Sequence, residues 1–139
     1  MTNFRKTATN VAITIAAAAA FALVPRDQGG TVDPVRMSLE ENGNGTLVSW
    51  DQVSGAVSYD VIRGLLSAIA QTDVVINLGS VTCIEADSTD ESTLGREDAD
   101  VPHPGEGFFY LIKYFDGTSS SYGAESTAKP RAPAGGDCD

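Results

Sequence analysis

The sequence predicts an all-β protein, an antiparallel β-sandwich preceded by an N-terminal apolar helical segment. Short stretches of alternating apolar and polar residues recur from residue 34 onward, and glycine-rich turns separate them. No long amphipathic helical pattern interrupts these stretches. With 139 residues the chain has room for one such domain, which takes roughly 100 residues.

The N-terminal segment, residues 1–22, has the pattern of a secretory signal peptide. Two basic residues and no acidic residue lie in its first ten positions, and an apolar run follows over residues 11–24. The run is too short for a membrane-spanning helix, which needs about 20 apolar residues. Ala20 and Ala22 form an A-x-A pattern, so we expect cleavage after Ala22.

Cleavage would leave a secreted or cell-surface protein, extracellular or periplasmic, with residues 23–33 as a linker. No cysteine directly follows the apolar run, so we expect no lipid anchor. We also expect no membrane insertion after the signal is removed. The alternative is that residues 1–22 are retained as an Ala-rich helix, which would be buried between the subunits of an assembly.

The net charge of -10 limits the classes of partner, because 19 acidic residues stand against 9 basic ones. Such a surface repels phosphate backbones and anionic headgroups, so we expect no nucleic-acid or peripheral membrane binding. The acidity fits a soluble exported protein, and a cationic partner or a divalent cation is the alternative.

The first half of the domain predicts three strands. Residues 35–39 alternate between apolar and polar, and residues 42–45 (NGNG) supply the positive-φ positions of a tight turn. Residues 46–50 alternate again, and residues 58–63 form the third strand.

The middle of the chain is less regular. Residues 65–70 predict a short helical turn, and residues 74–81 resemble a strand that Asn77 and Gly79 weaken. Residues 85–104 are acidic and rich in breakers, so they predict a long surface loop with at most one short strand.

Residues 108–114 (FFYLIKY) predict the strongest strand, and residues 119–127 complete a hairpin with it. Both faces of this strand are apolar, so Phe109 and Leu111 need a cover. We expect the middle stretch or the C-terminal tail to supply it, rather than a partner. The prolines and glycines of residues 129–139 exclude regular structure there.

Four motifs together resemble a fibronectin type III-like module, an immunoglobulin-like sandwich, of secreted bacterial proteins. They are LVSWD at 47–51, GAVSYDVIRG at 55–64, FFYLIKY at 108–114 and SYG at 121–123. The resemblance covers residues 34–131, with residues 132–139 as a tail tied by a disulfide.

The resemblance implies a structural core rather than a binding site. It assigns the buried aromatic positions to Trp50, Tyr59 and Tyr110, and Val61 and Ile112 lie on the same strand faces as the two tyrosines. The integrin-binding R-G-D triplet of some type III modules is missing from the sequence, so their adhesive role does not transfer.

We expect a disulfide between Cys83 and Cys138, the two cysteines of the chain, because an exported protein folds in an oxidising compartment. The bridge would close a loop of about 55 residues, worth roughly 4 kcal/mol in the chain-entropy model. An intermolecular pair or free thiols are the alternatives.

A metal site has weak support in the sequence. Asp87, Asp90 and Glu91 could supply some oxygen ligands to calcium, yet the D-x-D-x-D-G spacing of a calcium loop is absent. We therefore expect a solvated loop for the acidic residues Glu85, Asp87, Asp90, Glu91, Glu97, Asp98 and Asp100.

Catalysis and cofactors are not expected. His103 is the one histidine, it lies in the loop sequence VPHPG, and no G-x-S-x-G motif accompanies it. The predicted function is a non-enzymatic exported binding or structural module with a protein or glycan partner. The alternatives are a filament or pilus-like subunit that self-assembles through its apolar helix, and a carbohydrate- or calcium-binding accessory domain.

Overall fold

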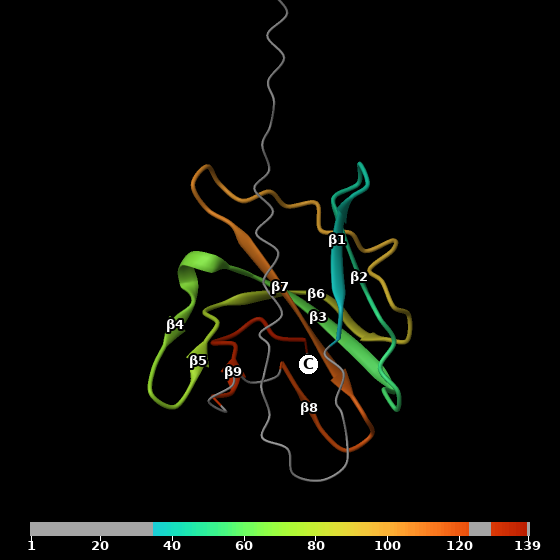
Figure 1. Ribbon diagram of the computed structural model, residues 1–139. Helices are drawn as coiled ribbons and strands as arrows, with labels where there is room; N and C mark the ends of the chain where they lie inside the picture. Colours follow the sequence, from blue (N-terminus) through green and yellow to red (C-terminus); the bar gives the residue numbers. More distant parts are fainter. Residues whose placement is uncertain (1–34, 123–128, 139) are drawn as a thin grey trace, which may run out of the picture.

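The computed structural model describes residues 35–122 and 129–138 (Figure 1). The predicted signal segment 1–22 and the linker 23–33 lie outside this part of the chain. The described part is mostly β, with antiparallel sheets and one short 3₁₀ helix, which confirms the predicted all-β class. Within it, no helix is long and apolar enough to cross a membrane.

A four-stranded antiparallel sheet in the order β6-β3-β7-β8 is the centre of the molecule. Strand β3 (Ser58–Leu65) lies between β6 (Val81–Ser88) and β7 (Phe108–Phe115), and β8 (Ser120–Ser121) extends the sheet beyond β7. The strands β3 and β7 pair along their whole length. Strands β7 and β8 form the predicted hairpin over the described residues, and residues 123–127 of its predicted second strand lie outside the described part of the chain.

A separate hairpin of β1 (Met37–Glu41) and β2 (Thr46–Trp50) lies beside the central sheet (Figure 1). The predicted turn joins the two strands, and Gly43 and Gly45 have φ angles of 86° and 140°. Only glycine adopts such angles without strain, which explains why the NGNG sequence ends one strand and starts the next.

The hairpin packs on one face of the central sheet through the residues that we call the Trp50 cluster. They come from β2, β3 and β7, and all are nearly inaccessible to solvent: Val48, Trp50, Tyr59, Val61 and Tyr110. Ile112 is partly buried and packs against them. Trp50 and Tyr59 lie with ring centroids 5.4 Å apart, and the Tyr59 hydroxyl accepts a hydrogen bond from the Val53 amide.

The prediction of one long surface loop over residues 85–104 is wrong in part. Residues 85–88 belong to β6, and residues 91–98 run along β2. Thr93 is fully buried. Its backbone amide donates a hydrogen bond to the Val48 carbonyl, and its hydroxyl accepts one from the Val48 amide. The physical reason is that β2 is buried, so its backbone groups need partners that sequence periodicity does not reveal.

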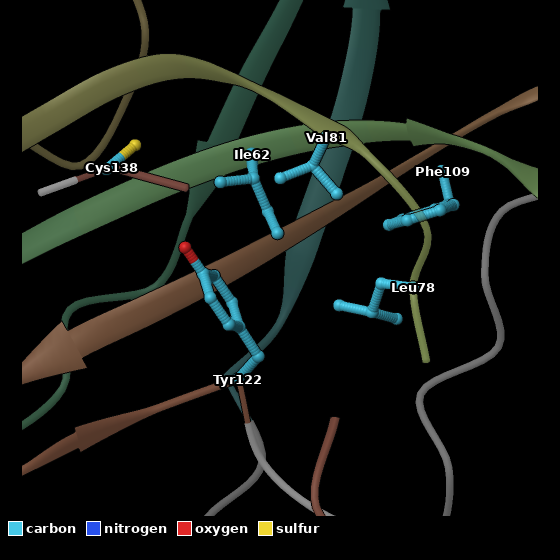
Figure 2. Packing of buried hydrophobic residues seen from close by; sticks show 6 residues of the cluster. All are labelled: Ile62, Leu78, Val81, Phe109, Tyr122 and Cys138. Atoms are coloured by element: carbon cyan, nitrogen blue, oxygen red, sulfur yellow. The ribbon is translucent and has the colours of Figure 1, made fainter. Parts of the chain in front are cut away.

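The opposite face of the central sheet carries the residues that we call the tail cluster. They come from β3, β6, β7, the segment between β5 and β6, and the residues that follow β8 and β9. Figure 2 shows their side chains: Ile62, Leu78, Val81, Phe109, Tyr122 and Cys138. The partly buried Leu111 packs against them. The expectation that the middle stretch and the tail cover Phe109 and Leu111 is confirmed, since Leu78 and Cys138 come from those segments.

The middle stretch forms small elements instead of one strand over residues 74–81. A 3₁₀ helix (Leu66–Ala68) confirms the predicted helical turn, and β4 (Ala70–Gln71) pairs with β5 (Ile76–Asn77). After β5 the chain turns at Gly79, whose φ is 73°, and β6 begins two residues after Gly79.

The tail has more regular structure than predicted. Its strand β9 (Arg131–Ala132) pairs in parallel with β5, and Ser80 and Gly135 continue that pairing as a bridge. The tail then ends in a disulfide between Cys83 and Cys138. Prolines do not prevent this pairing, because a short edge segment needs few amide donors.

Candidate functional site

A cleft of about 450 Å³ lies where the last residues of β3 and the first residues of β6 meet the loop before β7. Its lining mixes charged, hydroxyl and apolar side chains. The lining residues are Arg63, Gly64, Leu65, Ser80, Thr82, Asp100, Val101, Pro102, His103, Glu106 and Phe108. We take it as the candidate binding site.

Arg63 of β3 forms the floor of the cleft. Strand alternation turns Arg63 to the same face as Tyr59 and Val61, so its side chain enters the protein instead of the solvent. Its guanidinium lies 4.3 Å from the centroid of the Phe108 ring, a cation–π contact. The side chain is therefore held by an aromatic face as well as by hydrogen bonds.

Two carboxylates pair with the guanidinium. Its Nη1 donates to both carboxylate oxygens of Asp98 at 2.7 and 2.9 Å and to Asp100 Oδ2 at 2.8 Å. Its Nη2 donates to the Thr82 hydroxyl at 3.2 Å. Burial alone lowers the pKa of Arg63, but the hydrogen bonds to Asp100 and Asp98 outweigh it and hold the pKa above its ordinary value.

Asp98 is a buried hub that the prediction of a solvated acidic loop missed. Its backbone exchanges two hydrogen bonds with Thr46, and its carboxylate accepts the Tyr110 hydroxyl at 2.8 Å. Burial raises the pKa of Tyr110, and the hydrogen bond to Asp98 raises it further, so the phenol stays protonated. Arg63, Asp98 and Tyr110 thus form one network under the cleft.

The rim of the cleft offers groups to the solvent. The Asp100 side chain is 70% exposed although it bonds Arg63, and Val101 is 83% exposed. His103 and Glu106 are exposed in a turn that the Glu106 amide closes on the His103 carbonyl. The cleft can therefore recognise a ligand through hydrogen bonds, carboxylate charge and apolar contact.

The structure also limits the chemistry at the cleft. Arg63 lines the cleft, but its Nη1 and Nη2 already bond two carboxylates and a hydroxyl, so fewer of its donors are open to a ligand. The imidazole of His103 lies on the exposed rim and not within the buried network.

The three calcium candidates lie outside the cleft and are exposed. The Asp87 amide donates to Asp60 Oδ1, the Asp90 amide donates to the Ser88 hydroxyl, and the Glu91 carbonyl accepts the Trp50 amide. Over residues 35–122 and 129–138, no group of three or more His, Cys, Asp or Glu side chains is arranged to hold a metal ion.

One signal in the sequence could have revealed the buried network. Arg63 follows Tyr59 and Val61 with the period of a strand, so it had to share their buried face. A buried guanidinium needs a carboxylate partner, and the acidic stretch before residue 104 was the nearest supply. The sequence alone does not say which of its acids would turn inward.

Comparison with known proteins gives no relative for the chain: no family model, no curated protein and no solved structure matches it.

Proposed function

We propose that the chain is a non-enzymatic exported module that binds a protein or glycan partner through the Arg63 cleft. The observation that carries the proposal is the hydrogen-bonded position of Arg63: Asp98, Asp100 and Thr82 hold its guanidinium at the floor of the cleft, and the rim has exposed polar and apolar groups. Such a floor presents a fixed shape to a ligand, which lowers the ordering cost of binding.

The proposal includes an immunoglobulin-like sandwich of the fibronectin type III-like kind. Two observations support it: β1, β2 and residues 91–98 lie together, and β2 packs through the Trp50 cluster on the sheet of β6, β3, β7 and β8. Sandwiches of this class hold loops at their two ends, where binding sites commonly lie. The cleft lies at one end of the central sheet.

Export rests on the signal-like segment 1–22, and the disulfide gives it weak support. Disulfides persist in oxidising compartments and are rare in the cytosol. Assembly through a retained apolar helix stays a prediction, because residues 1–22 lie outside the described part of the chain. A calcium-binding role also stays a prediction.

A chemical-shift titration of the isotope-labelled domain tests the proposed site. The probes are soluble oligosaccharides and short peptides of each charge type, added one at a time. We expect the shifts that move to belong to the cleft, around Ser80, Thr82 and residues 100–108. Shifts confined to another surface would overturn the assignment of the site, and the absence of any response would contradict a binding role.

Variants on the rim sharpen that experiment. His103→Ala and Glu106→Ala alter exposed groups of the cleft and leave the Arg63 network intact, so they should weaken binding without changing stability. Val74→Ala is the matched control, because Val74 is 74% exposed and does not line the cleft. Equal loss of binding in the control would contradict the proposal.

A further inference from the structure

We propose that Asn44 is a site of spontaneous deamidation and isomerisation, and that Asn42, in the same turn, is protected from this reaction. Both residues are exposed in the turn between β1 and β2, and each is followed by glycine. The two Asn-Gly pairs have the same local sequence chemistry. Their hydrogen bonds in the folded protein differ.

The reaction needs no enzyme and no cofactor. The backbone nitrogen of the glycine attacks the side-chain Cγ of the preceding asparagine, a C–N bond forms, and ammonia leaves. Water then opens the cyclic imide at one carbonyl to give aspartate, or at the other to give isoaspartate. Glycine favours the attack because it has no Cβ to hinder the approach and leaves the backbone free to turn.

Asn42 is held against this attack. Its Oδ1 accepts the Asn44 amide at 3.0 Å, and its Nδ2 donates to Glu97 Oε1 at 3.0 Å. The nucleophile is engaged as well, because the Gly43 amide donates to Glu41 Oε1 at 3.3 Å. These bonds fix the side chain and must break before the nitrogen of Gly43 reaches Cγ.

Asn44 has no comparable restraint. Among the described residues, the structure records no hydrogen bond to its side-chain amide and none from the Gly45 backbone nitrogen. The side chain is exposed at the tip of the turn, where it can rotate onto the backbone. The folded structure therefore separates two sites that the sequence leaves equivalent.

Isomerisation at Asn44 would affect Asp98, which bonds Arg63 at the floor of the cleft. Gly45 lies so close to Asp98 that a Cβ there would collide with the Asp98 carbonyl. The next residue, Thr46, exchanges backbone hydrogen bonds of 2.8 and 3.0 Å with Asp98. Isoaspartate at position 44 adds one carbon to the backbone just before this bridge, so it disturbs the backbone that positions the Asp98 carboxylate under Arg63.

Ageing of the folded protein in mildly alkaline buffer, followed by peptide mapping with fragmentation that distinguishes aspartate from isoaspartate, tests the proposal. We expect Asn44 to convert roughly tenfold faster than Asn42, the factor expected from a few exposed hydrogen bonds of modest net strength. In concentrated urea the two rates should become similar. Equal rates in the folded protein, or faster conversion of Asn42, would overturn the proposal.

Two variants separate the protection from other causes. Glu97→Ala removes the acceptor of the Asn42 side chain, so it should raise the rate at Asn42 and leave the rate at Asn44 unchanged. Asn44→Asp supplies the added charge without the longer backbone. Faster hydrogen exchange at the Thr46 and Asp98 amides is expected in the isoaspartate product and not in this variant; the same exchange in both would contradict the proposed route to Asp98.

Discussion

The two faces of the central sheet are covered in different ways. On the side of the Trp50 cluster, the cover is a hairpin with its own ladder of hydrogen bonds and a tryptophan, and the Cys83–Cys138 disulfide does not involve it. On the side of the tail cluster, the cover consists of two-residue strands and a tail that a disulfide holds. Because two-residue strands supply few ladder hydrogen bonds, we expect the disulfide to carry a large share of the restraint on this cover.

The two faces also differ in the segments that their ion pairs join. Arg63 and Asp98 form a buried ion pair at 2.7 Å beside the Trp50 cluster. On the tail side, Lys113 bridges the sheet to the tail, with Asp60 at 3.0 Å and Asp137 at 3.7 Å. Both Arg63–Asp98 and Lys113–Asp60 are largely shielded from solvent, but Lys113 also links the sheet to a segment that the disulfide positions.

Removal of the disulfide should cause the largest loss of stability, on the face that the tail covers. The double variant Cys83→Ser with Cys138→Ser opens a sequence separation of 55 residues, and we expect a loss of about 4 kcal/mol in the free energy of unfolding. Urea denaturation followed by circular dichroism measures it. A loss below about 1 kcal/mol would mean that the tail cover holds without its staple.

Asp98→Ala should be the most damaging change on the other face. It leaves the Arg63 guanidinium buried without its main partner and removes the acceptor of the Tyr110 hydroxyl, so we expect a loss of about 3 kcal/mol. Asp90→Ala is the control, because Asp90 is exposed, and it should change stability by less than about 0.5 kcal/mol. Equal effects would show that Asp98 is not a hub.

Alkaline pH should weaken both faces through one tyrosine each. Burial, and then hydrogen bonds to Asp98 and Asp137 respectively, raise the pKa of Tyr110 and Tyr122 above the ordinary value of 10.0. Because the pKa is raised in the folded state, this stability is fully present below about pH 10 and is lost as the pH rises further.

The measurement is the free energy of unfolding across that range of pH. Tyr110→Phe should lower stability at neutral pH and flatten part of the alkaline decline, and Tyr122→Phe should flatten the rest. A decline of unchanged slope in the double variant would assign the alkaline loss to other groups.

Asp87→Gly should have the smallest effect and the opposite sign. Asp87 has a φ of 51°, which strains a residue with a Cβ, and its exposed side chain lies near the end of β6. We expect a gain of about 0.5 kcal/mol by thermal unfolding. Addition of calcium during the thermal unfolding tests the calcium hypothesis. Calcium bound at a site that uses Asp87 would stabilise the original chain and not the variant.

The features that the sequence could predict are local ones. Strong alternation and turn glycines located β1, β2, β3 and β7 but not β6, and the core positions Trp50, Tyr59, Val61 and Tyr110 are buried. The Cys83–Cys138 pairing was predictable because the chain has two cysteines. These features depend on local pattern or on simple counting.

The missed features depend on pairing between distant segments. Residues 91–98 and the tail are irregular in sequence, yet the backbone edges of β2 and β5 give them partners. Asp98 looks like its neighbours in an acidic stretch, and only its position beside β2 turns it toward Arg63. Tertiary contacts of this kind leave no period in the sequence.

Hydrogen exchange of the folded protein, with and without a reducing dithiol, tests the central claim most directly. If each face has its own cover, reduction should raise exchange in β5, the start of β6 and residues 130–138, and leave the Val48 and Trp50 amides of β2 protected. Equal loss of protection on both faces, or no change on either, would contradict the claim that the disulfide holds one cover and burial holds the other.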